Sequence, residues 1–218
     1  MSVPLLQGTE WFVDEKTLES TRRSLHAVAE SLLAGPQYRA SGTIRLQLTT
    51  KGFKTRAEPE LLVEGAQVIA QGHGYPLSGV TLKELGAMLG VEAAGPGNYH
   101  DGADAGPDEP IEVDPEAAEQ MFKALNMGQE GLRSFAPQQE PVLWPEHFDV
   151  GILVNDVAYG VSPGDRHIGM PYAYVSAQAP DDDPYWNESF GAAKLISELG
   201  SAENIAQFFN EGQSRLSG

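Results

Sequence analysis

Two apolar runs that only Asn155 and Asp156 separate are the feature that most constrains the fold of this chain. Asn and Asp tolerate positive φ, so this dipeptide predicts a two-residue turn between antiparallel strands. Such a turn fixes which residues of the two strands face each other. The predicted partners, counted outward from the turn, are Val154 with Val157, Leu153 with Ala158, Ile152 with Tyr159, Gly151 with Gly160, Val150 with Val161, Asp149 with Ser162, and Phe148 with Pro163.

Alternation of side chains along a strand gives this hairpin two faces of opposite character. One face is apolar and is predicted to be core: Phe148, Val150, Ile152, Val154, Val157, Tyr159 and Val161. The other face carries His147, Asp149, Gly151, Leu153, Ala158, Gly160 and Ser162. Its middle has almost no side chains, and glycines that face each other mark the close approach of another group.

The stripped face is the candidate site. We predict a trough over Gly151 and Gly160 in which a ligand lies, with a strand at 172–176 as a wall that carries Tyr172 and Tyr174. Polar and aromatic residues would edge it: His147, Asp149, Ser162 and Asp165, with Trp144 at the mouth. Two other interpretations remain open. Small residues also let a helix pack close to a sheet, and His147 and Asp149 are also suited to capping a strand or meeting solvent.

The order of the expected elements indicates an α+β fold. Antiparallel strands from residues 43–70 and 147–177 are expected to form one sheet or two packed sheets, covered by about four helices within a single domain, 1–218. The expected helices are 14–34, 81–89, 114–132 and 202–213. Strands alternating singly with helices, the mark of a parallel sheet, are not seen.

Glycine, proline and helix-capping residues indicate the expected boundaries of these elements. Gly35-Pro36 predicts the end of the first helix, and Gly128 and Gly131 predict a kink or an early end in the third. A capping box at 81–84 and Asp114-Pro115 predict two helix starts. Residues 71–76 are expected to form a loop, and a second hairpin is expected to turn near Gly65.

Charge excludes one class of partner. The net charge is −17, and nine acidic residues but no Lys or Arg lie between Glu92 and Glu119. Such a surface repels phosphate backbones, so we expect no nucleic-acid partner. The segment 93–110 is predicted to be a mobile acidic loop. Its oxygen ligands would also suit Ca²⁺, although the spacing of an EF-hand is absent.

Catalytic chemistry is an alternative to simple binding. His147 and Asp149 would act as a general acid–base pair, or would hold zinc or iron together with His100 or His167. Ser162 would complete a Ser/His/Asp set, although it precedes a proline instead of lying on a strained turn. The chain has no Cys, which excludes disulfides and thiolate sites, and the sequence indicates no particular cofactor.

The sequence also bears on location. There is no run of about 18 apolar residues, so we expect no membrane span, and the N-terminal residues lack the basic and apolar regions of a signal peptide. A cytoplasmic protein is the expectation.

Several short stretches together resemble a group of uncharacterised proteins from actinobacteria. They are Leu-Trp-Pro-Glu-His-Phe-Asp at 143–149, Tyr-Gly-Val-Ser-Pro-Gly-Asp at 159–165, Pro-Tyr-Ala-Tyr at 171–174 and Phe-Gly-Ala at 190–192. The resemblance implies a bacterial protein and brings no activity with it.

Three functions from different classes are therefore expected from the sequence. The first is a protein that binds a small molecule or a protein partner at the trough. The second is a metal-assisted or general-base hydrolase that uses His147 and Asp149. The third is an interaction protein whose acidic face contacts a basic partner. The oligomeric state is left open.

Overall fold

A computed structural model of the chain describes residues 13–98, 102–178 and 183–217. Its strands are β1 (Leu46–Thr49), β2 (Gly52–Thr55), β3 (Leu61–Glu64), β4 (Gln67–Ala70), β5 (His73–Pro76), β6 (Val142–Trp144), β7 (Asp149–Val154), β8 (Val157–Ser162), β9 (Tyr172–Ser176) and β10 (Gly191–Leu195). Its helices are α1 (Glu15–Val28), the π-helix η1 (Ala29–Ala34), α2 (Gly35–Ser41), α3 (Leu82–Leu89), α4 (Pro115–Phe135), α5 (Ile196–Leu199) and α6 (Ala202–Leu216).

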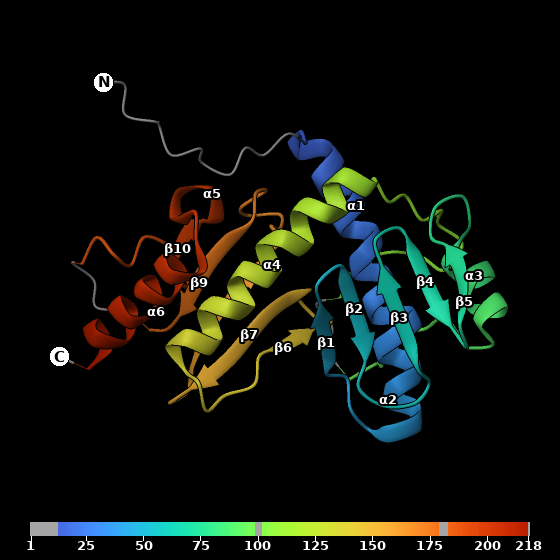
Figure 1. Cartoon of the computed structure of the whole chain (residues 1–218), viewed down its shortest axis with the longest axis horizontal. Coiled ribbons are helices and arrows are strands. Elements are labelled where there is room, and N and C mark those ends of the chain that lie inside the picture. The colour runs from blue at the N-terminus through green and yellow to red at the C-terminus, as the bar shows by residue number, and fades with distance from the viewer. Residues whose placement is uncertain (1–12, 99–101, 179–182, 218) are drawn as a thin grey trace.

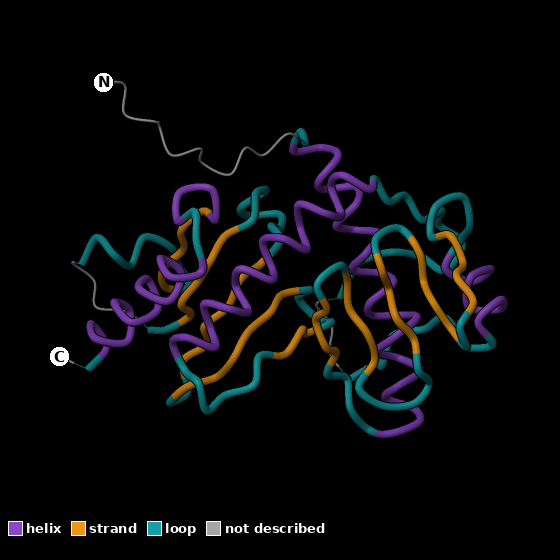
Figure 2. The backbone as a smooth tube through the Cα atoms, in the orientation of Figure 1, coloured by secondary structure: helices purple, strands orange, loops and turns teal. Residues whose placement is uncertain are grey.

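All ten strands form one antiparallel sheet, in the order β10-β9-β8-β7-β6-β1-β2-β3-β4-β5. The sheet consists of two five-stranded meanders, β1–β5 and β6–β10, each of which follows a long helical segment. They join where Leu46 of β1 pairs with Leu143 of β6. Figure 2 shows the strands continuing from one half to the other. The predicted α+β class with strands from 43–70 and 147–177 is confirmed.

Twist of the sheet determines how the helices lie in space. In Figure 1 α4 lies in front of β7, whereas α1 and α2 lie behind β2 and β3. The pairs Leu46 with Leu143 and Leu143 with Val150 show that the buried side is continuous across the join. A right-handed twist rotates each strand by roughly 20° relative to its neighbour, so one face of a wide sheet comes to point in opposite directions at its two ends.

The predicted hairpin is confirmed for the five pairs nearest its turn, but the two outer predicted pairs, Asp149 with Ser162 and Phe148 with Pro163, are not among the pairs of the β7–β8 ladder. Asn155 and Asp156 have φ of 51° and 64°, as a type I′ turn requires. The five pairs nearest the turn, from Val154 with Val157 to Val150 with Val161, have the predicted register. Most of the predicted core face is buried, and Tyr159 and Val161 are at most 1% exposed, whereas Val154 and Val157 beside the turn are half-buried. The buried side chains pack against α4 and α6; for example, the rings of Tyr159 and Phe209 meet edge to face with centroids 5.8 Å apart.

Helix caps behave as predicted where the signal is local. Thr81 and Glu84 form a reciprocal capping box at α3, and Gly90 ends that helix with positive φ. Asp114 caps α4 through the backbone N–H of Ala117, and Ser201 caps α6. The second hairpin also turns at Gly65, as expected.

Three boundary predictions were wrong. The first helical segment does not end at Gly35-Pro36 but continues through η1 into α2, which ends at Gly42. Proline has no N–H to give to a helix, and the wider π-turn before it absorbs that loss. Residues 73–76 form strand β5 at the edge of the sheet instead of a loop.

The third error concerns α4, which runs unbroken past Gly128. A Cβ at Gly128 would lie 2.5 Å from Cβ of Val161 in β8. This glycine therefore lets the helix approach the sheet closely, and it neither kinks nor shortens the helix.

None of the helices in the described parts of the chain combines the length and the apolar character that crossing a membrane requires.

Candidate functional site

A cleft of about 1460 Å³ lies between α1 and the face of β7–β9 that α4 does not cover. Its walls come from regions far apart in the sequence, which include α1 and the start of η1, residues 93–95 and 102–109, the β6–β7 turn at 146–148, and the β8–β9 loop at 164–167. The strand residues of its wall include Asp149, Ala158 and Tyr174. We call this feature the central cleft. It contains the candidate face that the sequence indicated, with one important difference.

The trough over the two glycines holds a side chain of the protein itself. Gly160 pairs with Gly151 on one side and with Tyr174 on the other. A Cβ at Gly160 would lie 2.5 Å from the hydroxyl of Tyr174, and one at Gly151 would lie 3.3 Å from it. The ring of Tyr174 therefore crosses β8 and fills the predicted trough, so a ligand does not lie directly on these glycines.

The side chain of Asp149 lies next to the hydroxyl group of Tyr174. The Tyr174 hydroxyl donates a hydrogen bond to Oδ2 of Asp149, whereas Oδ1 is buried and has no donor among the described residues. The side chain is only 6% exposed. Burial is the main reason that the pKa of Asp149 rises to about 6, and the bond from Tyr174 partly opposes this. Burial and the Asp149 carboxylate hold the pKa of Tyr174 well above its usual value.

The prediction that His147 lies on the same strand face as Asp149 is wrong. Phe148 has φ of 53°, so the regular alternation breaks before β7 begins. His147 and Glu146 instead occupy the β6–β7 turn, and both line the central cleft. Regular strand alternation would place Glu146 on the face opposite Asp149, whereas the break at Phe148 brings it to the cleft. The His147 side chain is 58% exposed, and its Nε2 lies 4.0 Å from a carboxylate oxygen of Glu146.

Asp165 and Ser162 line the cleft but are occupied with holding the β8–β9 loop. Oδ1 of Asp165 accepts from the backbone N–H groups of His167 and Ile168, both at 2.7 Å, and Oδ2 accepts from the Tyr172 hydroxyl at 2.5 Å. These bonds outweigh burial and lower the pKa of Asp165. The Ser162 hydroxyl exchanges hydrogen bonds with the backbone of Gly164. Each of these two side chains therefore has a structural role.

Trp144 lies outside the central cleft. It pairs with Asp149 across the β6–β7 hairpin, but its ring is 5.5 Å from the guanidinium of Arg45. The predicted place at the mouth of the site is therefore wrong.

Helix α1 contributes Glu19, Arg22, Arg23 and His26 to the cleft lining, and Arg22 and His26 lie one turn apart. Arg22 donates to the backbone oxygens of Gly169 at 3.1 Å and Asp165 at 3.2 Å. His26 stacks on Phe148, and its Nε2 is 2.7 Å from the oxygen of Pro145. Because a carbonyl oxygen only accepts, that nitrogen carries the proton. Burial lowers the pKa of His26 to about 4, so the ring is neutral at physiological pH.

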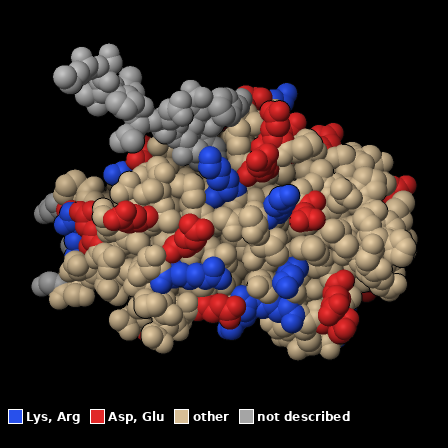
Figure 3. Space-filling view, in the orientation of Figure 1, with Lys and Arg blue, Asp and Glu red and all other residues tan. Residues whose placement is uncertain are grey.

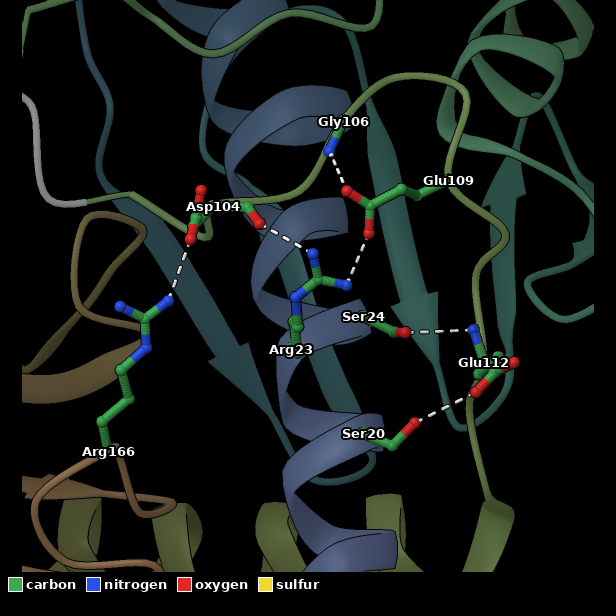
Figure 4. Close-up of polar contacts among 8 residues, drawn as sticks. All are labelled: Ser20, Arg23, Ser24, Asp104, Gly106, Glu109, Glu112 and Arg166. Carbon is green, nitrogen blue, oxygen red and sulfur yellow. Dashed lines mark hydrogen bonds and ion pairs between the residues drawn. The ribbon is translucent and has the colours of Figure 1, made fainter.

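Residues 102–109 form a further wall, and the segment 102–114 is bound along α1. Figure 4 shows Arg23 contacting Glu109 and the backbone oxygen of Asp104, while Ser20 and Ser24 contact Glu112. The Arg23–Glu109 pair is 2.6 Å long. On the other side, Arg166 reaches Asp104 from the β8–β9 loop at 3.0 Å. The described parts of the acidic segment 93–110 are thus anchored; their mobility stays a prediction.

Metal binding receives no geometric support. In residues 13–98, 102–178 and 183–217, no three His, Asp or Glu side chains are grouped so as to hold a metal ion. His100, one of the weak metal candidates, lies outside the described residues. His167 is bound at 2.7 Å to Glu188, which raises the pKa of His167.

Partial signals for the cleft residues that we did not predict are present in the sequence. Arg22 falls in the apolar stripe of its helix, between Leu18 and Leu25, and an arginine in such a position indicates a buried contact. His26 lies one turn further on the same side. No local signal indicates that Glu146 or Glu30 turns toward the cleft, because these placements depend on the positive φ of Phe148 and on contacts between distant segments.

Comparisons of the chain with models of protein families, with curated proteins and with solved structures gave no significant match. The resemblance to the actinobacterial group stays a prediction.

Proposed function

We propose that the protein binds a small molecule in the central cleft. The observation that carries this proposal is Asp149, a carboxyl group that is almost fully buried in the cleft wall and has one oxygen without a donor. Leaving a buried acceptor without a partner costs about 1–3 kcal/mol, and more for a charged group. Buried polar groups that lack a hydrogen-bond partner concentrate at functional sites, where a ligand or a water molecule supplies the missing partner.

The surface supports a small ligand better than a protein partner. Among the described residues the exposed large hydrophobic side chains are Met88 of α3, 52% exposed, and Leu153 of β7, 60% exposed. Figure 1 shows these elements in opposite halves of the molecule, so the two side chains do not form one apolar patch. On the face that Figure 3 shows, acidic and basic side chains are interspersed, which does not favour the acidic interaction surface.

The hydrolase alternative has less support. No hydrogen bond or ion pair joins His147 to Asp149 in the described structure, and the Ser162 hydroxyl is bound to backbone groups. The predicted acid–base pair and the Ser/His/Asp set are therefore not assembled.

A fragment screen by NMR on the full chain tests the proposal. Binding compounds are expected to shift backbone amides of the β6–β7 turn, β8 and β9. The substitution Ala158→Phe, which places a ring in the cleft, is expected to abolish those shifts. The matched control is Ala87→Phe, because Ala87 is an exposed residue of α3 that does not line the cleft. Compounds that bind the Ala158→Phe variant as well as the wild type would refute the proposal.

A further inference from the structure

The wall of the central cleft around Asp149 offers hydrogen-bond acceptors. Tyr174 gives its only hydroxyl hydrogen to Asp149, and Tyr172 gives its own to Asp165. The two phenol oxygens therefore retain only lone pairs for a ligand. Oδ1 of Asp149 also accepts only, as long as the group is ionised. A group that binds here has to be a donor.

The arginines that line the cleft are already occupied. Arg22 binds two backbone oxygens, and Arg23 binds Glu109. Arg166 binds Asp104. Seven carboxylates line the cleft against these three guanidinium groups. The cleft consequently has a surplus of negative charge and offers an anionic ligand no unoccupied arginine.

The surplus is most marked where Glu146 meets Asp149. Two neighbouring groups act on the pKa of Asp149 in opposite directions: His147 lowers it, and Glu146, to a smaller extent, raises it by repulsion. The basic group found near Glu146 is His147, at 4.0 Å. Neither carboxylate is paired with a lysine or an arginine in the described structure. A cation bound beside these two carboxylates would weaken this repulsion.

We propose that the ligand of the central cleft is an organic cation, with an ammonium or guanidinium group that binds beside Glu146 and Asp149. This inference rests on the proposed function and names the chemical class of its ligand. The rings of Tyr172 and Tyr174, with centroids 6.2 Å apart, both line the cleft, and the face of an aromatic ring attracts a cation. An ammonium or guanidinium group also brings several N–H donors, which matches a wall of acceptors.

Three four-carbon probes separate charge from shape: putrescine, butanediol and succinate, which carry two positive charges, none, and two negative charges. Agmatine adds a guanidinium. Calorimetric titration of the full chain near neutral pH is expected to give putrescine or agmatine a Kd at least about tenfold lower than butanediol or succinate. Calcium chloride at equal ionic strength is the control for general attraction to a chain of net charge −17.

Substitutions then locate the binding. We expect each of the substitutions Glu146→Gln and Asp149→Asn to raise the Kd of putrescine or agmatine by about tenfold. Glu146 is in a turn and 29% exposed, so its variant tests the idea even if Asp149→Asn folds poorly. The matched control is Glu130→Gln, which removes the same charge from an exposed position of α4, on the opposite side of the sheet, and is expected to leave the Kd within about twofold.

The outcomes distinguish the two proposals. Three results would each overturn the inference about the cation. Butanediol would bind as tightly as putrescine, calcium would compete equally well, or Glu130→Gln would weaken binding as much as Glu146→Gln. In each of these cases the proposed function stands if Ala158→Phe abolishes binding of any probe or fragment. If no cation binds but neutral or anionic fragments do, again sensitive to Ala158→Phe, only the cation is refuted. If nothing binds in the cleft, both proposals fail.

Discussion

Tyr174 reaches across strand β8 and donates its hydroxyl hydrogen to Asp149 on β7, passing over the two glycines that pair between them. This contact explains why the outer face of the hairpin lacks side chains. Glycine is needed there because any Cβ at Gly160 would collide with the ring. Asp149 is the one buried polar residue of the candidate face with a side-chain oxygen that lacks a donor among the described residues.

Removing the hydroxyl of Tyr174 should destabilise the protein more than removing that of Tyr172. Tyr174→Phe leaves Asp149 without its side-chain donor, and we expect the free energy of unfolding to fall by about 1–3 kcal/mol. Tyr172→Phe is the matched control, because Asp165 keeps two backbone donors at 2.7 Å; its cost should be about 1 kcal/mol or less. Urea unfolding of both variants measures the difference. Equal costs would contradict the interpretation of Asp149 as the poorly satisfied carboxylate.

Asp149 should reduce stability as the pH rises. Its pKa is raised from 3.8 to about 6 in the folded protein, so between these values the folded state holds a proton that the unfolded chain has lost. The free energy of unfolding therefore falls as the pH increases from about 4 to about 6, by an amount of about 2 kcal/mol.

Asp149→Asn should abolish that decline and increase stability at pH values above about 6, where the wild-type carboxylate is charged and buried. Urea unfolding across this range measures both effects. A variant that is less stable than the wild type above pH 6 and keeps its slope would show that the carboxylate is well satisfied in the folded protein.

His26 should have the opposite effect on stability. Burial lowers its pKa from 6.5 to about 4, so between these values the unfolded chain binds a proton that the folded protein does not. Stability is complete above about pH 6.5 and falls toward pH 4, by about 3 kcal/mol. His26→Gln keeps a donor for the oxygen of Pro145 and should make the acid side of the curve flatter. Identical slopes in the variant and the wild type would refute this assignment.

Gly160→Ala should disturb packing at one defined contact. The new Cβ would lie 2.5 Å from the Tyr174 hydroxyl and 2.6 Å from the ring carbon that carries it, so the ring has to move; we expect a loss of about 1–3 kcal/mol. Gly151→Ala, whose Cβ would approach to 3.1 Å, is the milder comparison.

A double-mutant cycle tests the cause of this loss. Combining Gly160→Ala with Tyr174→Ala should recover part of it, because the colliding ring is then absent. Strict additivity of the two substitutions would mean that the glycine is required for another reason.

Features encoded in a few consecutive residues could be predicted from the sequence. The turn at Asn155 and Asp156 predicted five pairs of the hairpin correctly, and Thr81 and Asp114 predicted two helix starts. Gly35-Pro36 and Gly128 misled because each carries a strong local signal for a helix end or kink. In the folded protein Gly35 lies against the oxygen of Ala94, and Gly128 lies against Val161. At both positions glycine is required because a residue distant in the sequence lies too close for a Cβ.

The sequence by itself determined the hairpin, its two faces and the position of Asp149 on the stripped face, because turn chemistry and strand alternation act over a few residues. Only the tertiary structure decided what occupies that face. It placed Tyr174 over the glycines, turned Glu146 into the cleft through the positive φ of Phe148, and brought Arg22 and His26 of α1 alongside. These placements follow from burying one continuous core beneath two joined meanders, which no local pattern specifies.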